Sequence, residues 1–363
     1  MRNRAKLLVL ALSLALITAA CGDGETTETT AAEAATTTAG GAGTTQPGSE
    51  EEPATTMAEE PVELVAVAGS SVDFISLVPL AAWAILAEEG ITVEQRYLEE
   101  APTAIQAITQ GEAQIGTNIG VNVGVPAVEA GASLVDVVAT QRPTWALAVA
   151  PDINTFEDLE GKRIAVHGEA SFTRAVSQYF AELHGFTYEE LIIPGSEVRA
   201  EALAQGQIDA SVIDLPDVVQ LSATYPDSFK VLSTIGEEFP ELIEQDLWLS
   251  REWAETNPEL ATRVVQAINE AMRRLTADSE YALALATENL PDMDPAVLEE
   301  LVNEYASRDI WPSDGLMTPE RAYETLVFFQ SVGEIELGEL SEDSVSKYFD
   351  FSYLETALQN LDG

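Results

Sequence analysis

Apolar runs and helical patterns alternate along most of the chain. The stretch "VELVAVAG" at 62–69 is a continuous apolar run, which is typical of a buried parallel strand. A helical pattern follows at 77–90 and a second strand pattern at 91–99. Strands that alternate with helices in this way predict a doubly wound α/β sheet. The other predicted strands are at 113–118, 134–141, 161–168, 191–196, 208–214, 229–236 and 247–250, and the other predicted helices at 102–111, 125–131, 172–185, 197–206 and 215–225.

One helix–turn–strand unit occurs twice in this pattern. Residues 107–118, "AITQGEAQIGTN", end a helix, turn at Gln-Gly and enter a short apolar stretch. Residues 202–214, "ALAQGQIDASVID", repeat the unit, with Gly206 lying 95 residues after Gly111. We interpret "PTWALAVAPD" at 143–152, between the two sets of elements, as a crossover. The pattern therefore predicts two similar lobes, each with a mostly parallel sheet flanked by helices.

The lobes are expected to be built from discontinuous parts of the chain. We expect lobe 1 at 62–146, lobe 2 at 147–237, and a return to lobe 1 with helical C-terminal residues at 238–363. The chain has 363 residues and is 46% hydrophobic, enough for two domains with sizeable cores.

The two repeats end in polar tips at the predicted strand ends. Ligands of open parallel sheets bind outside the carboxyl ends of the strands, where helix N-termini also point. Thr117 and Asn118 follow one strand, and Asp214 follows the other. If the lobes face each other, these side chains meet one ligand across a cleft.

The first 61 residues have a different composition. Residues 1–20 combine early basic residues with an apolar run, as a secretory signal peptide does. Cys21, the single cysteine, follows "ITAA", and this resembles a bacterial lipobox whose cysteine is lipidated. Residues 21–61 are rich in Thr, Ala, Gly and Glu, and we expect a disordered acidic tether there. The alternative is a soluble secreted protein with an unmodified cysteine.

The charge of the chain narrows the classes of partner. There are 17 Lys and Arg residues against 62 Asp and Glu residues, a formal net charge of −45. This field repels nucleic acid and anionic lipid headgroups. We therefore expect no nucleic-acid partner, and we expect a monomer.

Three stretches resemble a known family. These are "FEDLEGKRIAVHGEASFTRAVSQYF…AEALAQGQIDASVID", "AVAGSSVDFISLVPLAAWAILAEEGITVE" and "YFDFSYLETAL", within 62–363. They are similar to the solute-binding proteins of ABC importers, in the group that serves nitrate, sulfonates, taurine and thiamine-pyrimidine precursors. The resemblance implies a two-lobed periplasmic-binding-protein clamp outside the cytoplasm. It also implies hinges near 143–150 and 237–250, and partners in a membrane permease and its ATPase.

The candidate ligand-binding residues lie at predicted strand ends, at the first crossover and at one helix start. The resemblance implies that small hydroxyl residues at the start of the 172–185 helix hold an anion or a polar head, while Glu169 would repel an anion. Asp214 has an alternative role as the N-cap of the next helix. The candidates are Asp73, Phe74, Thr117, Asn118, Gln141, Trp145, Ser171, Phe172, Thr173 and Asp214.

These residue types favour one ligand class over another. The carboxylates accept hydrogen bonds and the aromatic rings stack, so we expect a flat, donor-bearing solute that is neutral or cationic. A pyrimidine, another heteroaromatic compound or an amine fits this description. The alternative is a sulfonate, nitrate or carboxylate anion bound at Ser171 and Thr173.

Catalytic chemistry finds little support in the sequence. His167 and His184 are the only histidines, and neither has a partner at metal-ligand spacing. There is no P-loop and no G-x-S-x-G motif. Fungal pyrimidine synthases with the same fold are the enzymatic alternative, but they use a Cys-rich iron-binding run, and this chain has no cysteine after Cys21. We expect no catalytic residue, metal or cofactor.

The proposed anchor is directly testable. Replacing Cys21 by Ser should release the protein from the membrane without affecting its fold, because Cys21 is expected to contact no core. Fractionation in the absence of detergent measures the distribution. A Cys21→Ser protein that still sediments with membranes would contradict the lipoprotein interpretation.

Overall fold

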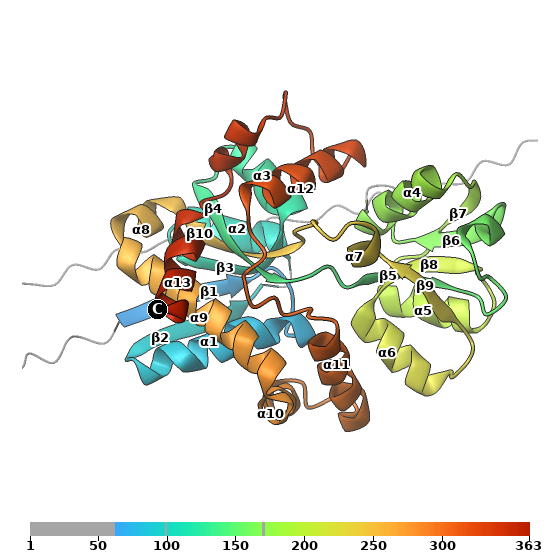
Figure 1. Ribbon diagram of the computed structural model, residues 1–363, viewed down its shortest axis with the longest axis horizontal. Coiled ribbons are helices and arrows are strands. Elements are labelled where there is room, and N and C mark those ends of the chain that lie inside the picture. The colour runs from blue at the N-terminus through green and yellow to red at the C-terminus, as the bar shows by residue number, and fades with distance from the viewer. Residues whose placement is uncertain (1–61, 99, 169–170) are drawn as a thin grey trace, which may run out of the picture. The chain divides into compact units, whose positions relative to one another are not determined.

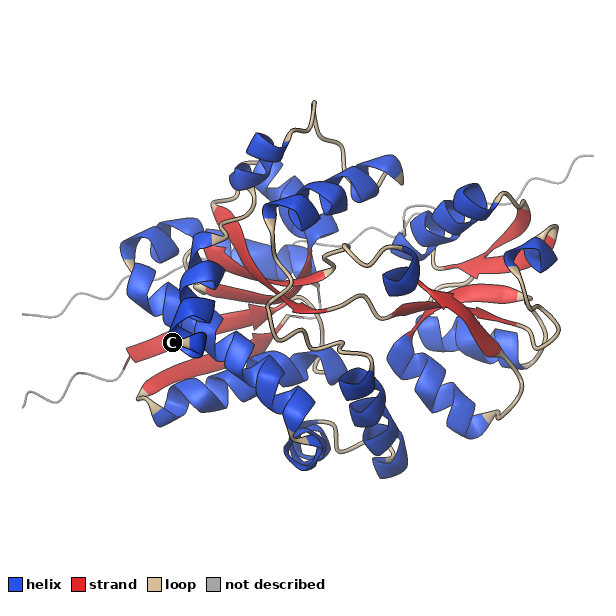
Figure 2. Ribbon diagram, in the orientation of Figure 1, coloured by secondary structure: helices blue, strands red, loops and turns tan. Residues whose placement is uncertain are grey.

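The computed structural model describes residues 62–98, 100–168 and 171–363 of the chain. The predicted signal peptide, the tether with Cys21, and Glu169 lie outside these residues. The described residues form two five-stranded sheets, each flanked by helices (Figure 1, Figure 2). The predicted two-lobed α/β fold is thereby confirmed.

The elements follow the predicted alternation closely. The strands are β1 (Val62–Ala68), β2 (Ile91–Tyr97), β3 (Ile115–Gly120), β4 (Leu134–Gln141), β5 (Trp145–Val149), β6 (Lys162–Val166), β7 (Tyr188–Ile192), β8 (Ala210–Asp214), β9 (Lys230–Thr234) and β10 (Gln245–Ser250). The helices are α1 (Leu77–Glu88), α2 (Ala101–Thr109), α3 (Val121–Glu129), α4 (Phe172–His184), α5 (Ser196–Ala204), α6 (Leu215–Thr224), α7 (Ile235–Glu238), α8 (Arg251–Thr256), α9 (Pro258–Ala277), α10 (Ser279–Asn289), α11 (Pro295–Ser307), α12 (Pro319–Ser331) and α13 (Ser352–Asp362). Short 3-10 helices are η1 (Phe74–Ser76), η2 (Phe156–Leu159) and η3 (Glu342–Lys347).

Each sheet contains one strand that runs against the others. The first sheet has the order β2-β1-β3-β10-β4, with β10 antiparallel to both of its neighbours. The second has the order β7-β6-β8-β5-β9, with β5 antiparallel to both of its neighbours. The two antiparallel strands occupy equivalent positions, and each follows a crossing of the chain between the sheets. Both crossings therefore arrive beside the carboxyl ends of β3 or β8.

Two predicted elements are corrected by the structure. The stretch 143–152 was expected to be a crossover, but Trp145–Val149 form β5 in the second sheet. An apolar run of this length is a buried central strand, and the crossing is confined to 142–144. The strand expected at 191–196 is Tyr188–Ile192, because Gly195 has a φ of 91° and the chain turns there into α5. The division into lobes at 146/147 and 237/238 stays a prediction, although β5 already begins at Trp145.

The two repeated units have the same local structure. Gly111 and Gly206 have φ angles of 76° and 69°, the left-handed conformation that glycine adopts after a helix. The next N–H groups, of Glu112 and Gln207, each donate a hydrogen bond of 2.9 Å to a carbonyl in the last helical turn. The Gln-Gly turn therefore ends the helix in the same way twice, and it directs β3 and β8 toward corresponding positions.

Trp248 fixes the returning strand β10 in the first sheet. Its side chain is fully buried, and its Nε1 donates a 3.0 Å hydrogen bond to the carbonyl of Ile119. The indole lies directly against Gly124 in α3, where an added Cβ would come within 2.2 Å of the ring. The absence of a side chain at Gly124 is what allows α3 to cover this part of the sheet.

Replacing Gly124 by Ala should therefore destabilise the protein. Alanine favours a helix by about 1 kcal/mol relative to glycine, but overpacking a buried site costs about 1–3 kcal/mol or more. We expect a net loss of about 1–2 kcal/mol in the free energy of unfolding, measured by urea denaturation. Gly338→Ala is the matched control, because an added Cβ there meets nothing within 4 Å. Equal stability of the two variants would contradict this packing.

Candidate ligand-binding site

A pocket of about 260 Å³ lies where the two crossings meet the ends of β1 and β8. We call it the acidic pocket, because carboxyl groups are its only ionisable lining groups among the residues that the structure describes. Both sheets and both crossings contribute to its wall. The lining residues are Asp73, Phe74, Ile75, Gln141, Thr144, Trp145, Asp214, Pro216, Asp217, Gln220, Glu244, Gln245 and Met293.

Asp214 lies at the end of β8, at the tip of the second repeat. It is the N-cap of α6, and its Oδ1 accepts a 2.9 Å hydrogen bond from the Leu215 N–H. The same oxygen accepts a 2.5 Å hydrogen bond from the Thr144 hydroxyl on the first crossing. Asp214 is therefore both a helix cap and a pocket residue. Thr144 holds its carboxylate in place.

Glu244 approaches the pocket from the second crossing. Its side chain is buried, and Oε1 accepts a hydrogen bond from Nε1 of Trp145, the first residue of β5. Its Oε2 is buried without a hydrogen-bond partner, and so is Oε1 of the neighbouring Gln245. A buried polar atom without a partner is costly, and protonation of the Glu244 carboxyl group reduces that cost.

Asp73 approaches from the first sheet, in the loop between β1 and α1. Its Oδ1 accepts a 3.2 Å hydrogen bond from the Ser76 hydroxyl, and the Ser76 Oγ accepts one of 3.3 Å from the Asp73 N–H. These bonds form a capping box at the start of η1. The side chain is thus held by η1 while it faces the pocket.

The carboxyl groups of the pocket hold protons more firmly than usual. Burial raises the pKa of Asp73 to about 7, and the charge of Asp214 raises it further, against hydrogen bonds that lower it. Burial raises the pKa of Asp214 to about 6. Burial, followed by the charge of Asp214, raises the pKa of Glu244 to about 8. Burial also raises the pKa of Tyr305, whose hydroxyl feels the charges of Asp214, Asp73 and Glu244.

Aromatic rings form the apolar part of the wall. Phe74 is buried and lies edge-on to Tyr305, with ring centroids 4.7 Å apart, and it stacks on Trp311 at 6.0 Å. Trp145 lies edge-on to Phe172 at 5.7 Å, and Phe172 contacts Phe329 of α12 at 5.9 Å. The pocket therefore combines carboxylates with ring faces and edges, as sites for amino groups and organic cations do.

The structure brings five of the predicted site residues together and places the other five outside the lining. Asp73, Phe74, Gln141, Trp145 and Asp214 line the acidic pocket. Phe172 lies behind Trp145, and Ser171 and Thr173 lie at the start of α4. Thr117 and Asn118 were expected at a strand end but are buried in the middle of β3, which continues to Gly120, and the amide of Asn118 donates to the hydroxyls of Ser70 (3.1 Å) and Ser76 (3.3 Å). Asn118 thereby supports the loop that carries Asp73, and a direct ligand contact for these five stays a prediction.

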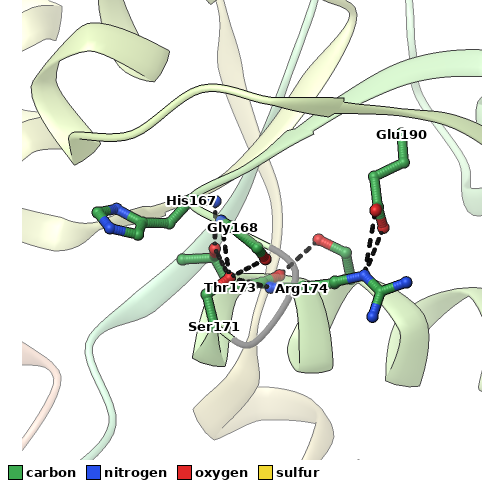
Figure 3. Close-up of polar contacts among 7 residues, drawn as sticks. His167, Gly168, Ser171, Thr173, Arg174 and Glu190 are labelled. Atoms are coloured by element: carbon green, nitrogen blue, oxygen red, sulfur yellow. Dashed lines mark hydrogen bonds and ion pairs between the residues drawn. The ribbon is translucent and has the colours of Figure 1, made fainter.

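The hydroxyl groups at the start of α4 are bonded within the protein (Figure 3). The Thr173 Oγ1 accepts a 2.9 Å hydrogen bond from the His167 N–H, and the Ser171 hydroxyl donates one of 2.8 Å to the Gly168 carbonyl. Ser171 is also the N-cap of the helix, accepting from the Arg174 N–H. Arg174 is paired with Glu190 at 2.9 Å.

Sequence reasoning missed Thr144, Asp217, Glu244 and Tyr305. Glu244 belongs to "LIEQD", and in a chain with 62 acidic residues one more glutamate carries no signal. The useful signal was its place in the predicted second hinge, since both hinges of such a fold border the cleft. Asp217, one helical turn after Asp214, also has a pKa raised by burial.

The described residues show neither a metal-binding cluster nor a membrane-spanning helix. Among them, no group of three or more His, Cys, Asp and Glu side chains is arranged to hold a metal ion. In the same part of the chain, no helix is long and apolar enough to cross a membrane.

Comparisons with known proteins identify a matching family for this chain. The profile of the family described as NMT1/THI5 like matches residues 86–282. None of the curated proteins compared with the chain matches it.

Solved structures with the same fold cover most of the chain. A putative periplasmic sulfonate-binding protein of an ABC transporter from Methylobacillus flagellatus is 18% identical, with 84% of this chain and 96% of that chain covered and a TM-score of 0.65. The periplasmic nitrate-binding protein of Synechocystis is 11% identical, covers 83% and 89%, and has a TM-score of 0.61. The ligand-binding component of an ABC-type import system from Staphylococcus aureus, determined with zinc bound, is 10% identical, covers 82% and 98%, and has a TM-score of 0.63. At these identities the likeness establishes the periplasmic-binding-protein fold.

The raised pKa values predict a pH dependence of stability. Between the ordinary carboxyl pKa, near 4, and a folded-state pKa of about 8 for Glu244, the folded protein binds more protons than the unfolded chain. The stability that comes from the protonated Glu244 is fully present below pH 4 and is lost as the pH rises from about 4 to about 8. We expect the melting temperature of the ligand-free protein to fall between pH 5 and pH 8, measured by scanning calorimetry. The fall should be smaller in Glu244→Gln, and parallel curves would contradict the assignment.

Proposed function

Because the chain belongs to the NMT1/THI5-like family, we propose that it is the solute-binding component of an ABC importer. It captures a small organic solute between its two lobes and delivers it to a membrane permease, which works with its ATPase. It acts outside the cytoplasm as a binding protein and not as an enzyme. The lipidated Cys21 anchors it to the outer face of the membrane as a monomer. The structures with the same fold that are named as transport binding proteins support this proposal.

The solute carries an amino or protonated nitrogen. The observation that supports this most strongly is the unpartnered Oε2 of Glu244, beside Asp73 and Asp214 in a pocket whose described lining has no basic residue. Where a carboxyl group of the pocket is ionised, it only accepts hydrogen bonds, so a ligand beside it brings N–H or O–H donors. A positive charge on the ligand also removes the repulsion among these carboxylates.

The aromatic wall favours the same ligand class. The indole N–H of Trp145 donates to the carboxyl group of Glu244, so the Trp145 ring lies beside that group, and Phe74 also lines the pocket. A cation over an aromatic face gains about 0.5–2 kcal/mol. An aliphatic amine fits this wall, and so does a flat heteroaromatic ring with an amino group, such as an aminopyrimidine.

An anion is the less favoured ligand. The start of α4 was the expected anion site, but the hydroxyls of Ser171 and Thr173 are bonded to the Gly168 carbonyl and the His167 N–H. An anion in the acidic pocket would face several carboxyl groups, and these would have to stay protonated.

Binding of simple probes tests the ligand class. We expect propylammonium, benzylammonium or 4-aminopyrimidine to bind in isothermal titration calorimetry, and nitrate, methanesulfonate and acetate not to bind. Glu244→Gln and Asp214→Asn should each weaken binding about ten- to hundredfold, because a hydrogen bond to a charged group contributes about 1.5–3 kcal/mol.

The matched control is Glu336→Gln, which removes an exposed carboxylate outside the pocket and should leave the affinity unchanged. Asp214→Asn keeps a capping oxygen for α6, so its melting temperature should stay close to that of the unmodified protein. Binding of the anions alone, unaffected by Glu244→Gln, would contradict the proposed ligand class.

A further inference from the structure

A second, larger cavity adjoins the acidic pocket. It has a volume of about 570 Å³ and shares two wall residues, Gln220 and Met293, with the acidic pocket. Gln220 lies on α6 beside the second sheet, and Met293 lies in the loop between α10 and α11. The two cavities are therefore neighbours that share these two residues in their walls.

The larger cavity has a different chemistry. Its apolar wall residues are Val72, Leu290, Pro291, Met293 and Val297, and we call it the apolar recess. Its polar lining residues are Gln220, Asn289 and the exposed Asp292 and Asp294, and none of its described lining residues is basic. Val72 is 40% exposed, so its side chain is accessible to an apolar group in the recess.

Both cavities draw on the two halves of the fold. In the apolar recess, Val72 follows β1 of the first sheet, and Gln220 belongs to the helix that follows β8 of the second. Helices α6 and α11 lie against each other at this place. A ligand that fills both cavities would thus contact both lobes along its whole length.

We propose that the solute is an amphiphilic amine, with its nitrogen in the acidic pocket and an apolar tail that passes between Gln220 and Met293 into the apolar recess. This inference rests on the function proposed above and adds the shape of the solute. The acidic pocket, at about 260 Å³, holds the head, and the more open recess, with about twice that volume, covers part of the tail.

A series of alkylammonium probes tests the tail site. Burying one methylene group is worth about 0.8 kcal/mol, which is about fourfold in affinity. We expect hexylammonium to bind up to roughly sixtyfold more tightly than propylammonium in isothermal titration calorimetry. Glu244→Gln should weaken both probes by the same factor, because both place the same head in the acidic pocket.

Two tryptophan variants on α6 separate the recess from unspecific apolar binding. Gln220→Trp fills the passage, so the ratio of the two dissociation constants should fall toward one. Ala223→Trp adds the same side chain at an exposed position of α6 that lines neither cavity, and its ratio should equal that of the unmodified protein.

The outcomes distinguish the two proposals. If propylammonium binds and hexylammonium gains less than about threefold, the tail site is wrong and the proposed function stands. If the gain persists in Gln220→Trp, the tail lies elsewhere and the inference is also overturned. If propylammonium does not bind while 4-aminopyrimidine does, the amphiphilic amine is excluded, but the importer function is not. If none of the nitrogen-bearing probes binds, the proposed ligand class fails with the inference.

Discussion

The burial of three carboxyl groups in one pocket is the main physical constraint on this structure. Asp73, Asp214 and Glu244 reach one pocket from three separate parts of the chain, and burial raises the pKa of each. A buried carboxylate is stable only with donors or a positive charge beside it. The protein supplies some donors, from Thr144, Ser76 and Trp145, and leaves the Oε2 of Glu244 without one. The pocket is therefore incomplete until a proton or a cationic group enters it.

The fold brings these carboxyl groups together because the same helix–turn–strand unit occurs in both lobes. A helix, a Gln-Gly turn and a strand occur once in each lobe, and the strand of the second unit ends at Asp214. The two crossings then return beside the ends of these strands, each followed by an antiparallel strand in an equivalent position. Thr144 lies in the first crossing, Trp145 begins the strand that follows it, and Glu244 lies in the second crossing. The Trp145–Glu244 hydrogen bond joins the two segments. Movement between the lobes would have to act through these same segments.

The architecture was predictable because it rests on local pattern. Strand and helix periodicities, with the repeated Gln-Gly turn, identify the α/β lobes. Asp214, at a strand end, and Asp73, in a loop, could be predicted as site residues because ligands of such sheets bind at the carboxyl ends of the strands. The β5 strand was mistaken for a crossover, since an apolar run beside a proline does not reveal its partners in the sheet. Glu244 was missed because its importance depends on a neighbour 99 positions away, Trp145. A ligand contact of Asn118 stays a prediction, and the hydrogen bonds of its amide to two serines, 48 and 42 residues away, are not encoded in any local pattern.

The most direct test of a cation-binding acidic pocket is whether protons are released or taken up when the ligand binds. Near pH 7 the carboxyl group of Glu244, with a pKa of about 8, is mostly protonated, and that of Asp73, with a pKa of about 7, is protonated in about half of the molecules. A cationic head replaces those protons, whereas an anion could enter only with additional ones. Titration of propylammonium into the protein in phosphate and in Tris, which differ in ionisation enthalpy, measures this change. The account predicts net release of protons, and net uptake, or the same heat in both buffers, would contradict it.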